Sequence, residues 1–369
     1  MPRFIASRLA EHSLALITNL QTPEGAYPAS PTFSAYAGYC WFRDGAFIAD
    51  GVSAAGDAAS AERFFDWCAG VLRERADHIG WIVEESRAGR APEGSQMLPA
   101  RFTFDGRDGT EEWWDFQLDG YGTWLWALVA HGRRHGTDLG RWRDAVELTT
   151  DYLLASWRRP CYDWWEEHSE HVHVSTLTCI AAGLDAVVDA GMLDRDRLDD
   201  ARSASAELHE LVLGRGVRDG HLVKWLGSTA VDGSLASAFA PLGVVDPRSG
   251  LGGATIDLLE RHLTVGGGTH RYLGDTFFGG GQWPLLSCFL GLAQLAAGDR
   301  QRAVELYEWA AGTATADLEL PEQVDEHLIA PRMRQEWLDR WGTVATPLLW
   351  SHAMLLRLGA ALDQEGPTR

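Results

Sequence analysis

Residues 161–174 read Cys161-Tyr-Asp-Trp-Trp-Glu-Glu-His-Ser-Glu-His-Val-His-Val174, and a helical apolar pattern begins where they end. Two Trp residues beside two Glu residues desolvate a carboxyl group and favour its neutral form, which is the state that a general acid must have. The stretch therefore predicts a candidate general acid. The residue types alone do not show whether Glu166 or Glu167 is the acid. Because three His lie nearby, a metal-binding site is an alternative interpretation.

Helical apolar periodicity recurs along the whole chain, which predicts an all-α fold of about twelve helices. The expected helical ranges are 4–20, a helix opened by Trp41-Phe-Arg-Asp44 that contains Phe47, Ile48 and Val52, then 60–76, 77–90, a segment from about Gly120, and 142–157, 174–190, 195–213, 232–241, 253–263, 283–297, 299–313 and 346–362. Alternating β-branched runs are scarce, so few strands are expected. About twelve helices in 369 residues suit six helical hairpins closed into an (α/α)6 barrel with the site in the loops at one end. No linker divides the chain, so we expect one catalytic domain over residues 1–369, with no β-sandwich or starch-binding module.

Charge and aromatic content limit the kinds of partner. The chain has 52 acidic and 32 basic residues, a net charge of −20, which repels nucleic acid and anionic membrane surfaces. Most of the 17 Trp fill the core, but several cluster with acids in WWDF, DWWEE and GQW. Flat rings beside carboxylates suit a neutral, hydroxyl-rich ligand such as a small oligosaccharide.

The sequence lacks the patterns of several other structural and targeting features. The five cysteines show no CxxC spacing, so neither a disulfide framework nor a zinc site is indicated. The N-terminus lacks the uninterrupted apolar core of a signal peptide, and no apolar run is long enough for a transmembrane helix, so a cytoplasmic protein is the default expectation. The Gly-rich GLGGAT and VGGGTH do not follow expected strands, so no cofactor is predicted.

Cleaving a glycosidic bond requires two carboxyl groups that flank it, one protonated and one ionised. Glu166 and Glu167 are adjacent and cannot easily be that pair. Glu322 in LELPEQVD is the candidate partner, because Pro321 fixes the backbone before it and apolar residues flank its loop.

Five blocks of the chain, in order, resemble glycoside hydrolase family 15, the glucoamylase-type enzymes. They are Trp41-Phe-Arg-Asp44, Gln117-Leu-Asp-Gly120, YDWWEEHSEHVHVSTLTCIAAGLDAV from Tyr162, Arg271-Tyr-Leu-Gly-Asp-Thr-Phe-Phe-Gly-Gly-Gly-Gln-Trp283, and LPEQVD (320–325) followed by TPLLWSHA (346–353). The resemblance implies an inverting exo-acting α-glucosidase on an (α/α)6 barrel. It implies that Glu166 is the general acid and Glu322 the general base, with their carboxyl groups roughly 6.5–9.5 Å apart.

The same resemblance implies the substrate contacts. Arg43 and Asp44 match the pair that holds the outer hydroxyls of the non-reducing glucose, and Arg271 matches a sugar-binding arginine. Glu167 matches a carboxylate that contacts the sugar beyond the cleavage point. The expected aromatic walls are Trp41, Trp113, Trp283 and Trp350, whereas Trp165 is expected to shape its loop. Tyr36 matches a tyrosine near the base, with Tyr39 as a competing candidate.

Three departures from the family pattern bear on these expectations. Phe277-Phe278 stands where many relatives have Tyr-Tyr, so a hydroxyl group near the base is missing. The family resemblance therefore does not predict the pH dependence of this enzyme. His168-Ser-Glu-His171 replaces an Asn-Gly turn. The missing accessory modules and export signal favour a short substrate of the isomaltose type, with α-1,6 linkage, hydrolysed inside the cell.

Several alternatives stay open. Glucoamylase, trehalase or glucodextranase-like specificity would use the same acid and base. A non-catalytic sugar-binding module is a second alternative, which both Glu residues argue against. A helical metal protein is a third, because Glu170-x-x-His173 has the spacing of di-iron sites, but no second such motif exists in the sequence. The oligomeric state is not readable from the sequence.

Overall fold

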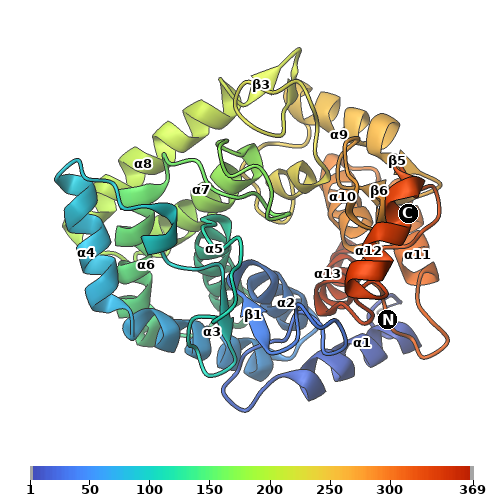
Figure 1. The fold of residues 1–369 in the computed structure, drawn as a ribbon, viewed down its shortest axis with the longest axis horizontal. Helices are drawn as coiled ribbons and strands as arrows, with labels where there is room; N and C mark the ends of the chain where they lie inside the picture. Colours follow the sequence, from blue (N-terminus) through green and yellow to red (C-terminus); the bar gives the residue numbers. More distant parts are fainter. Residues whose placement is uncertain (1–2, 366–369) are drawn as a thin grey trace.

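The structure, a computed structural model, describes residues 3–365 and consists mainly of helices arranged in two concentric rings (Figure 1). The α-helices are α1 Arg8–Leu20, α2 Phe42–Ala54, α3 Ala58–Arg73, α4 Ala76–Arg87, α5 Asp119–His135, α6 Arg143–Ser156, α7 Val174–Asp189, α8 Arg195–Leu213, α9 Gly250–Leu263, α10 Pro284–Ala297, α11 Arg300–Gly312, α12 Arg334–Trp341 and α13 Leu349–Glu365. Residues 1–2 and 366–369, the ends of the expected 1–369 domain, lie outside the described part.

The inner ring contains α2, α5, α7, α10 and α13, and the outer ring contains α1, α3, α6, α8, α9 and α11 (Figure 1). Apart from α4 and α12, which lie outside the two rings, successive helical elements alternate between the outer and inner rings, which is the arrangement of an (α/α)6 barrel. Inner helices contact each other closely: a Cβ on Gly122 of α5 would lie 2.4 Å from the carbonyl oxygen of Cys179 in α7. Only a residue without a side chain permits this approach.

The sixth inner position is held by a short 3₁₀ segment. η3, Gly233–Ala238, packs between α7 and α10 and is buried throughout. The α-helix predicted for residues 232–241 is therefore wrong in type: Asp232 caps the segment through Ser234, and Pro241 cannot continue a helix. The prediction also lacked α12, because RQEWLDRW has too few apolar residues to produce a periodic signal.

The strands are few and short, as predicted. They are β1 Tyr39–Trp41, β2 Arg101–Thr103, β3 Val217–Arg218, β4 His221–Leu222, β5 Thr264–Val265, β6 Gly268–His270 and β7 Gln282–Trp283. β1 pairs antiparallel with β2, β3 with β4, and β6 with both β5 and β7. β1 leads directly into α2, and β7 into α10, so these small sheets fix the chain where it enters an inner helix.

None of the described helices is both long and apolar enough to cross a membrane. The five cysteines are buried and unpaired, which agrees with the absence of a disulfide pattern.

Candidate active site

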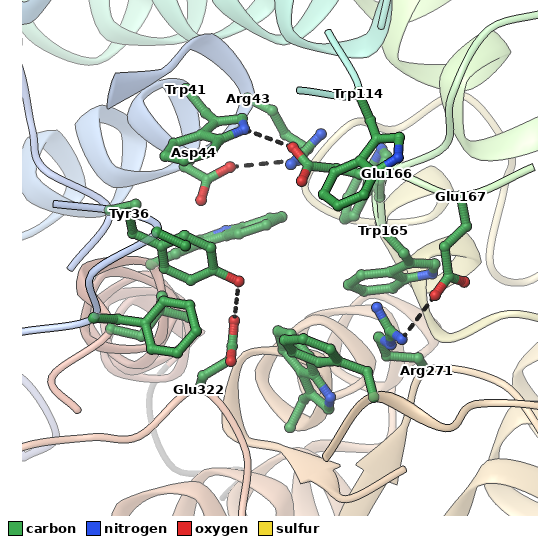
Figure 2. A pocket seen from close by; sticks show the side chains of 18 of the residues that line it. Tyr36, Trp41, Arg43, Asp44, Trp114, Trp165, Glu166, Glu167, Arg271 and Glu322 are labelled. Carbon is green, nitrogen blue, oxygen red and sulfur yellow. Dashed lines mark hydrogen bonds and ion pairs between the residues drawn. The ribbon is translucent and has the colours of Figure 1, made fainter. Parts of the chain in front are cut away.

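One pocket collects all eleven site residues that the sequence predicts. It is lined by Tyr36, Trp41, Arg43, Asp44, Trp113, Glu166, Glu167, Arg271, Trp283, Glu322 and Trp350 (Figure 2). These residues come from segments far apart in the sequence. They meet because each precedes an inner helix or lies in its first turn, so the pocket sits at the N-terminal ends of the inner ring. The positive ends of the helix dipoles therefore surround its carboxylates.

Glu166 accepts three hydrogen bonds on a single carboxylate oxygen. Its Oε1 receives the indole N–H of Trp41 at 2.7 Å and that of Trp113 at 3.0 Å. The side-chain amide of Gln117 donates to the same atom at 3.2 Å. Because these donors occupy Oε1, a proton on Glu166 resides on Oε2, which is then the atom able to deliver it.

The backbone at Glu166 is strained. Its φ is 64°, in the left-handed region that costs a non-glycine residue about 1–3 kcal/mol. A tight turn causes this conformation, because the amide of Glu166 donates to the carbonyl of Asp163 at 3.0 Å. The turn separates two neighbouring carboxylates: Glu166 faces Trp41, and Glu167 faces Arg271 (Figure 2).

Glu322 lies on the opposite side of the pocket from Glu166 (Figure 2). It is 2% exposed, and burial raises its pKa to about 8 despite the hydrogen bond from Tyr36 and the charge of Arg271. The Tyr36 hydroxyl donates to Oε1 of Glu322 at 2.9 Å. Burial, and then the negative charge of Glu322, hold the pKa of Tyr36 well above its ordinary value, so the phenol remains a donor.

The structure separates the two tyrosines that the sequence left as competitors. Tyr36 bonds Glu322, whereas the hydroxyl of Tyr39 donates to Glu111 and its ring packs on Arg101. The guanidinium of Arg101 also lies 3.8 Å from the ring centre of Trp113. Arg101 thus stacks behind an indole that bonds Glu166. Arg101 belongs to none of the sequence motifs, so the sequence did not indicate its contact with Trp113.

Arg43 and Asp44, the pair that the sequence predicts to bind sugar hydroxyls, lie side by side in the pocket lining. Arg43 donates to Gln117 at 2.5 Å and lies 3.4 Å from Asp119 and from Asp44. Burial raises the pKa of Asp44 to about 6, although Arg43 opposes this effect. The two side chains are almost entirely buried, and Nε of Arg43 and Oδ2 of Asp44 face each other at 3.4 Å as an ion pair, although neither atom makes a hydrogen bond within the described residues.

Other polar atoms of the pocket are in the same situation. Oε2 of Glu322 and the indole nitrogens of Trp283 and Trp350 are buried without a hydrogen-bond partner in residues 3–365. Buried polar groups in native proteins are nearly always satisfied, so each orphan calls for an explanation. A ligand with several hydroxyl groups would satisfy both the donors and the acceptors.

Arg271 and Glu167 occupy the side of the pocket next to Trp165. Arg271 lies 3.3 Å from Glu167 and also donates to Asp275 at 2.8 Å. Its guanidinium lies within 5.5 Å of the ring centres of Trp165 and Trp283. Trp165 was expected only to shape its loop, but it also lines the pocket.

The sequence reasoning missed several lining residues, chiefly Phe33, Trp114, Trp164, Trp337 and Trp341. Trp337 and Trp341 belong to the unpredicted α12, so no signal placed them. Trp114 adjoins Trp113 in the WWDF motif, and this motif could have indicated it. Phe277 lines the pocket, and Phe278 packs behind it against Trp337. These two residues replace the Tyr-Tyr pair of many relatives, so neither contributes a hydroxyl group to the pocket.

The histidines after Glu167 form an aromatic cluster. His171 stacks on Trp225 with 4.2 Å between ring centres, and His173 bonds the carbonyl of His168 at 2.9 Å. Within residues 3–365, no group of three His, Cys, Asp or Glu side chains is arranged to hold a metal ion.

Comparisons with known proteins identify the family of the chain. Residues 6–225 match the family described as glycosyl hydrolases family 15. The chain is 54% identical over 355 residues to the protein named isomaltose glucohydrolase of Kribbella flavida, covering 96% of this chain and 92% of that one. It is 24% identical over 248 residues to trehalase 2 of Sulfolobus acidocaldarius, covering 60% and 42%.

The solved structures extend the likeness to the fold. A glycosidase variant with a glutamate replaced by alanine, in complex with glucose, is 53% identical, with a TM-score of 0.94 and 96% of each chain covered. A bacterial glucoamylase complexed with acarbose shares the fold, with a TM-score of 0.78 at 19% identity, over 97% of this chain and 56% of that one. The matched family, the extensive identity and the shared barrel show that this chain is a glycoside hydrolase and belongs to glycoside hydrolase family 15.

Proposed function

We propose that this enzyme hydrolyses the α-1,6 bond of isomaltose and of similar short α-glucosides, releasing β-glucose from the non-reducing end. The observation that carries the proposal is the set of orphaned polar atoms around Glu166 and Glu322, because a glucose ring offers hydroxyls to satisfy them. The linkage is supported by the 54% identity to a protein named isomaltose glucohydrolase.

In this mechanism, Glu166 is the general acid. The bond between the anomeric carbon and the glycosidic oxygen breaks, and Oε2 of Glu166 gives its proton to that oxygen. The N–H groups on Oε1 stabilise the carboxylate that remains, because hydrogen bonds to a charged acceptor are the stronger ones.

Glu322 is the general base. A water on the opposite face of the ring attacks the anomeric carbon and passes a proton to Oε2 of Glu322, while Tyr36 holds Oε1. Attack from that face inverts the configuration, so an α-glucoside yields β-glucose.

Arg43 and Asp44 are proposed to bind the outer hydroxyls, since a fixed donor and acceptor together recognise hydroxyl direction. Glu167 and Arg271 are proposed to contact the sugar ring near the cleavage point. The indoles that line the pocket are proposed to pack against the C–H faces of glucose.

The test is to incubate the enzyme separately with isomaltose, maltose, trehalose and dextran and to follow the anomeric protons by NMR. We expect the fastest release from isomaltose, with β-glucose appearing first. Faster hydrolysis of maltose or trehalose would overturn the proposed linkage. Initial release of α-glucose would contradict inversion and the role of Glu322 as a base.

A further inference from the structure

Lys224 is the only lysine in the 369 residues, and it is buried beneath the loop that carries Glu166. Its side chain is 3% exposed. The backbone of Lys224 accepts the amide of Val174, the first residue of α7, at 3.1 Å and donates to Ala230 at 2.8 Å. The lysine is therefore fixed to the helix that the loop enters.

The ammonium group bridges two buried carboxylates. Nζ lies 2.7 Å from Oδ2 of Asp232 and 3.2 Å from Oδ2 of Asp163. Burial alone lowers the pKa of Lys224, but Asp232 and then Asp163 outweigh it, so its pKa is raised above the ordinary value. The lysine is thus charged, and removing it would leave two carboxylates buried without their cation, which is strongly destabilising.

Asp163 determines the backbone course of the loop. Its Oδ1 accepts the amide of Trp165 at 2.9 Å and that of Glu167 at 3.0 Å. Its carbonyl accepts the amide of Glu166 at 3.0 Å. A left-handed residue persists only where its surroundings over-determine it, and Asp163 supplies these restraints to Glu166.

The other two neighbours of the ammonium reach the same loop through side chains. Asp232 accepts the indole N–H of Trp165 at 3.0 Å. The ring centre of Tyr272 lies 3.5 Å from Nζ, and the Tyr272 hydroxyl donates to Glu167. The ammonium therefore contacts three groups, each of which bonds a residue of Trp165–Glu167.

We propose that Lys224 is a positioning residue that holds the strained turn at Glu166, through Asp163 and Asp232, so that the acid is aimed at the glycosidic oxygen. The inference rests on the proposed role of Glu166 as the general acid. Lys224 does not line the pocket, so it acts on the reaction only through the loop.

The test compares two substrates of Lys224→Met. Isomaltose needs a proton from Glu166 to release its leaving sugar, whereas α-glucosyl fluoride releases fluoride without one. A misplacement of about 1 Å costs on the order of 100-fold, so we expect kcat for isomaltose to fall about 100-fold. We expect kcat for α-glucosyl fluoride to fall less than about threefold, because acid assistance is not required there.

The matched control is Arg357→Met. Nε of Arg357 lies 2.7 Å from Oδ2 of Asp50, which is 1% exposed, so this change also breaks an ion pair to a buried carboxylate, away from the pocket lining. It should lower the unfolding temperature without altering the ratio of the two activities. Equal loss of both activities in Lys224→Met, or no loss of either, would overturn the proposal.

Two further measurements keep the test decisive if Lys224→Met does not fold. Lys224→Arg retains the charge but changes the shape of the side chain. We expect a smaller loss of isomaltose turnover in this variant, again without a similar loss for α-glucosyl fluoride. An equal loss for both substrates refutes the inference. In the wild type, labelling lysine with ¹⁵N at Nζ gives one signal from one residue. Its titration midpoint must lie above the ordinary value of about 10.4, and a lower midpoint contradicts the paired ammonium.

Failure of the proposed function gives a different pattern. Glu166→Gln should lose isomaltose turnover and retain α-glucosyl fluoride turnover. If it loses both equally, the acid assignment fails before Lys224 is considered. If the wild type prefers another α-glucoside, only the linkage fails, and the Lys224 ratio is measured with that substrate.

Discussion

The hydroxyl of Tyr36 donates to Oε1 of Glu322 at 2.9 Å, while Oε2 of the same carboxyl group has no hydrogen-bond partner among the described residues. Tyr36 thus holds one oxygen, and the other is the atom to which the proposed mechanism assigns the attacking water. Burial raises the pKa of Glu322 to about 8, whereas a base must be ionised to accept a proton. The pH dependence of the activity tests whether Glu322 has this raised pKa.

The ascending limb of the pH profile should report Glu322. Because its pKa is about 8 in the empty pocket, kcat/KM for isomaltose should rise as the pH increases through the range of about 7–8. Initial rates at low substrate concentration between pH 5 and 9 check this. A plateau already reached near pH 5 would mean that Glu322 ionises with its ordinary pKa.

The stability of Glu322→Gln should depend on pH in a defined direction. The folded-state pKa is raised from 4.5 to about 8, so the protonated group favours the folded state below pH 4.5 and this contribution is lost as the pH rises through 8. Glutamine stays neutral. The variant should therefore unfold at a higher temperature than the wild type at pH 9 and at a similar temperature at pH 4.5, which parallel thermal melts would test.

Removing one donor from Glu166 should lower turnover. Trp113→Phe keeps an aromatic ring but loses the N–H that bonds Oε1 at 3.0 Å. A hydrogen bond to a charged group contributes about 1.5–3 kcal/mol, so kcat for isomaltose should fall on the order of 10-fold to 100-fold. Trp114→Phe also changes an indole of the pocket lining but leaves the three donors in place, so it measures the cost of altering the lining alone. Equal effects in both variants would exclude a specific role of the Trp113 N–H.

Glu167 should distinguish substrates by their leaving group. Its carboxylate is held by Arg271 and Tyr272 beside the pocket, and Glu167→Gln removes its charge with little change in shape. If it binds the leaving sugar, KM for isomaltose should rise on the order of 10-fold, as expected for one charge-assisted hydrogen bond. KM for α-glucosyl fluoride, which has no leaving sugar, should change little. An equal rise for both substrates would place Glu167 against the retained glucose instead.

The barrel was predictable because each long helix carries its own periodic signal. Helices such as α8 and α10 begin and end within a residue of their expected limits. The periodic signal was wrong in type at η3, where a helix was expected and a 3₁₀ segment forms before Pro241. It was missing at α12, which has no buried residues and therefore no apolar face.

The site was predictable as a list of residues but not as a network. Acids beside tryptophans indicated Glu166 or Glu167, and an apolar-flanked loop after Pro321 indicated Glu322, whereas Arg271 came only from the family resemblance. The supporting contacts come from residues such as Lys224, Asp232 and Arg101, each isolated in an unremarkable segment. Only the ring brings Asp232 under Trp165, 67 residues earlier in the chain.

The ring is closed without a covalent link. α1 packs against α13, and the carboxylate of Asp363 accepts the backbone amides of Arg3 at 2.7 Å and Phe4 at 3.1 Å (Figure 1). The two ends of the fold are therefore neighbours, so the barrel is a natural candidate for circular permutation. A short linker could join the present ends, and new ends could be opened at the exposed Asp219-Gly220 turn of the β3–β4 hairpin, on the outer side and away from the pocket. The order of the inner helices around the pocket would stay the same.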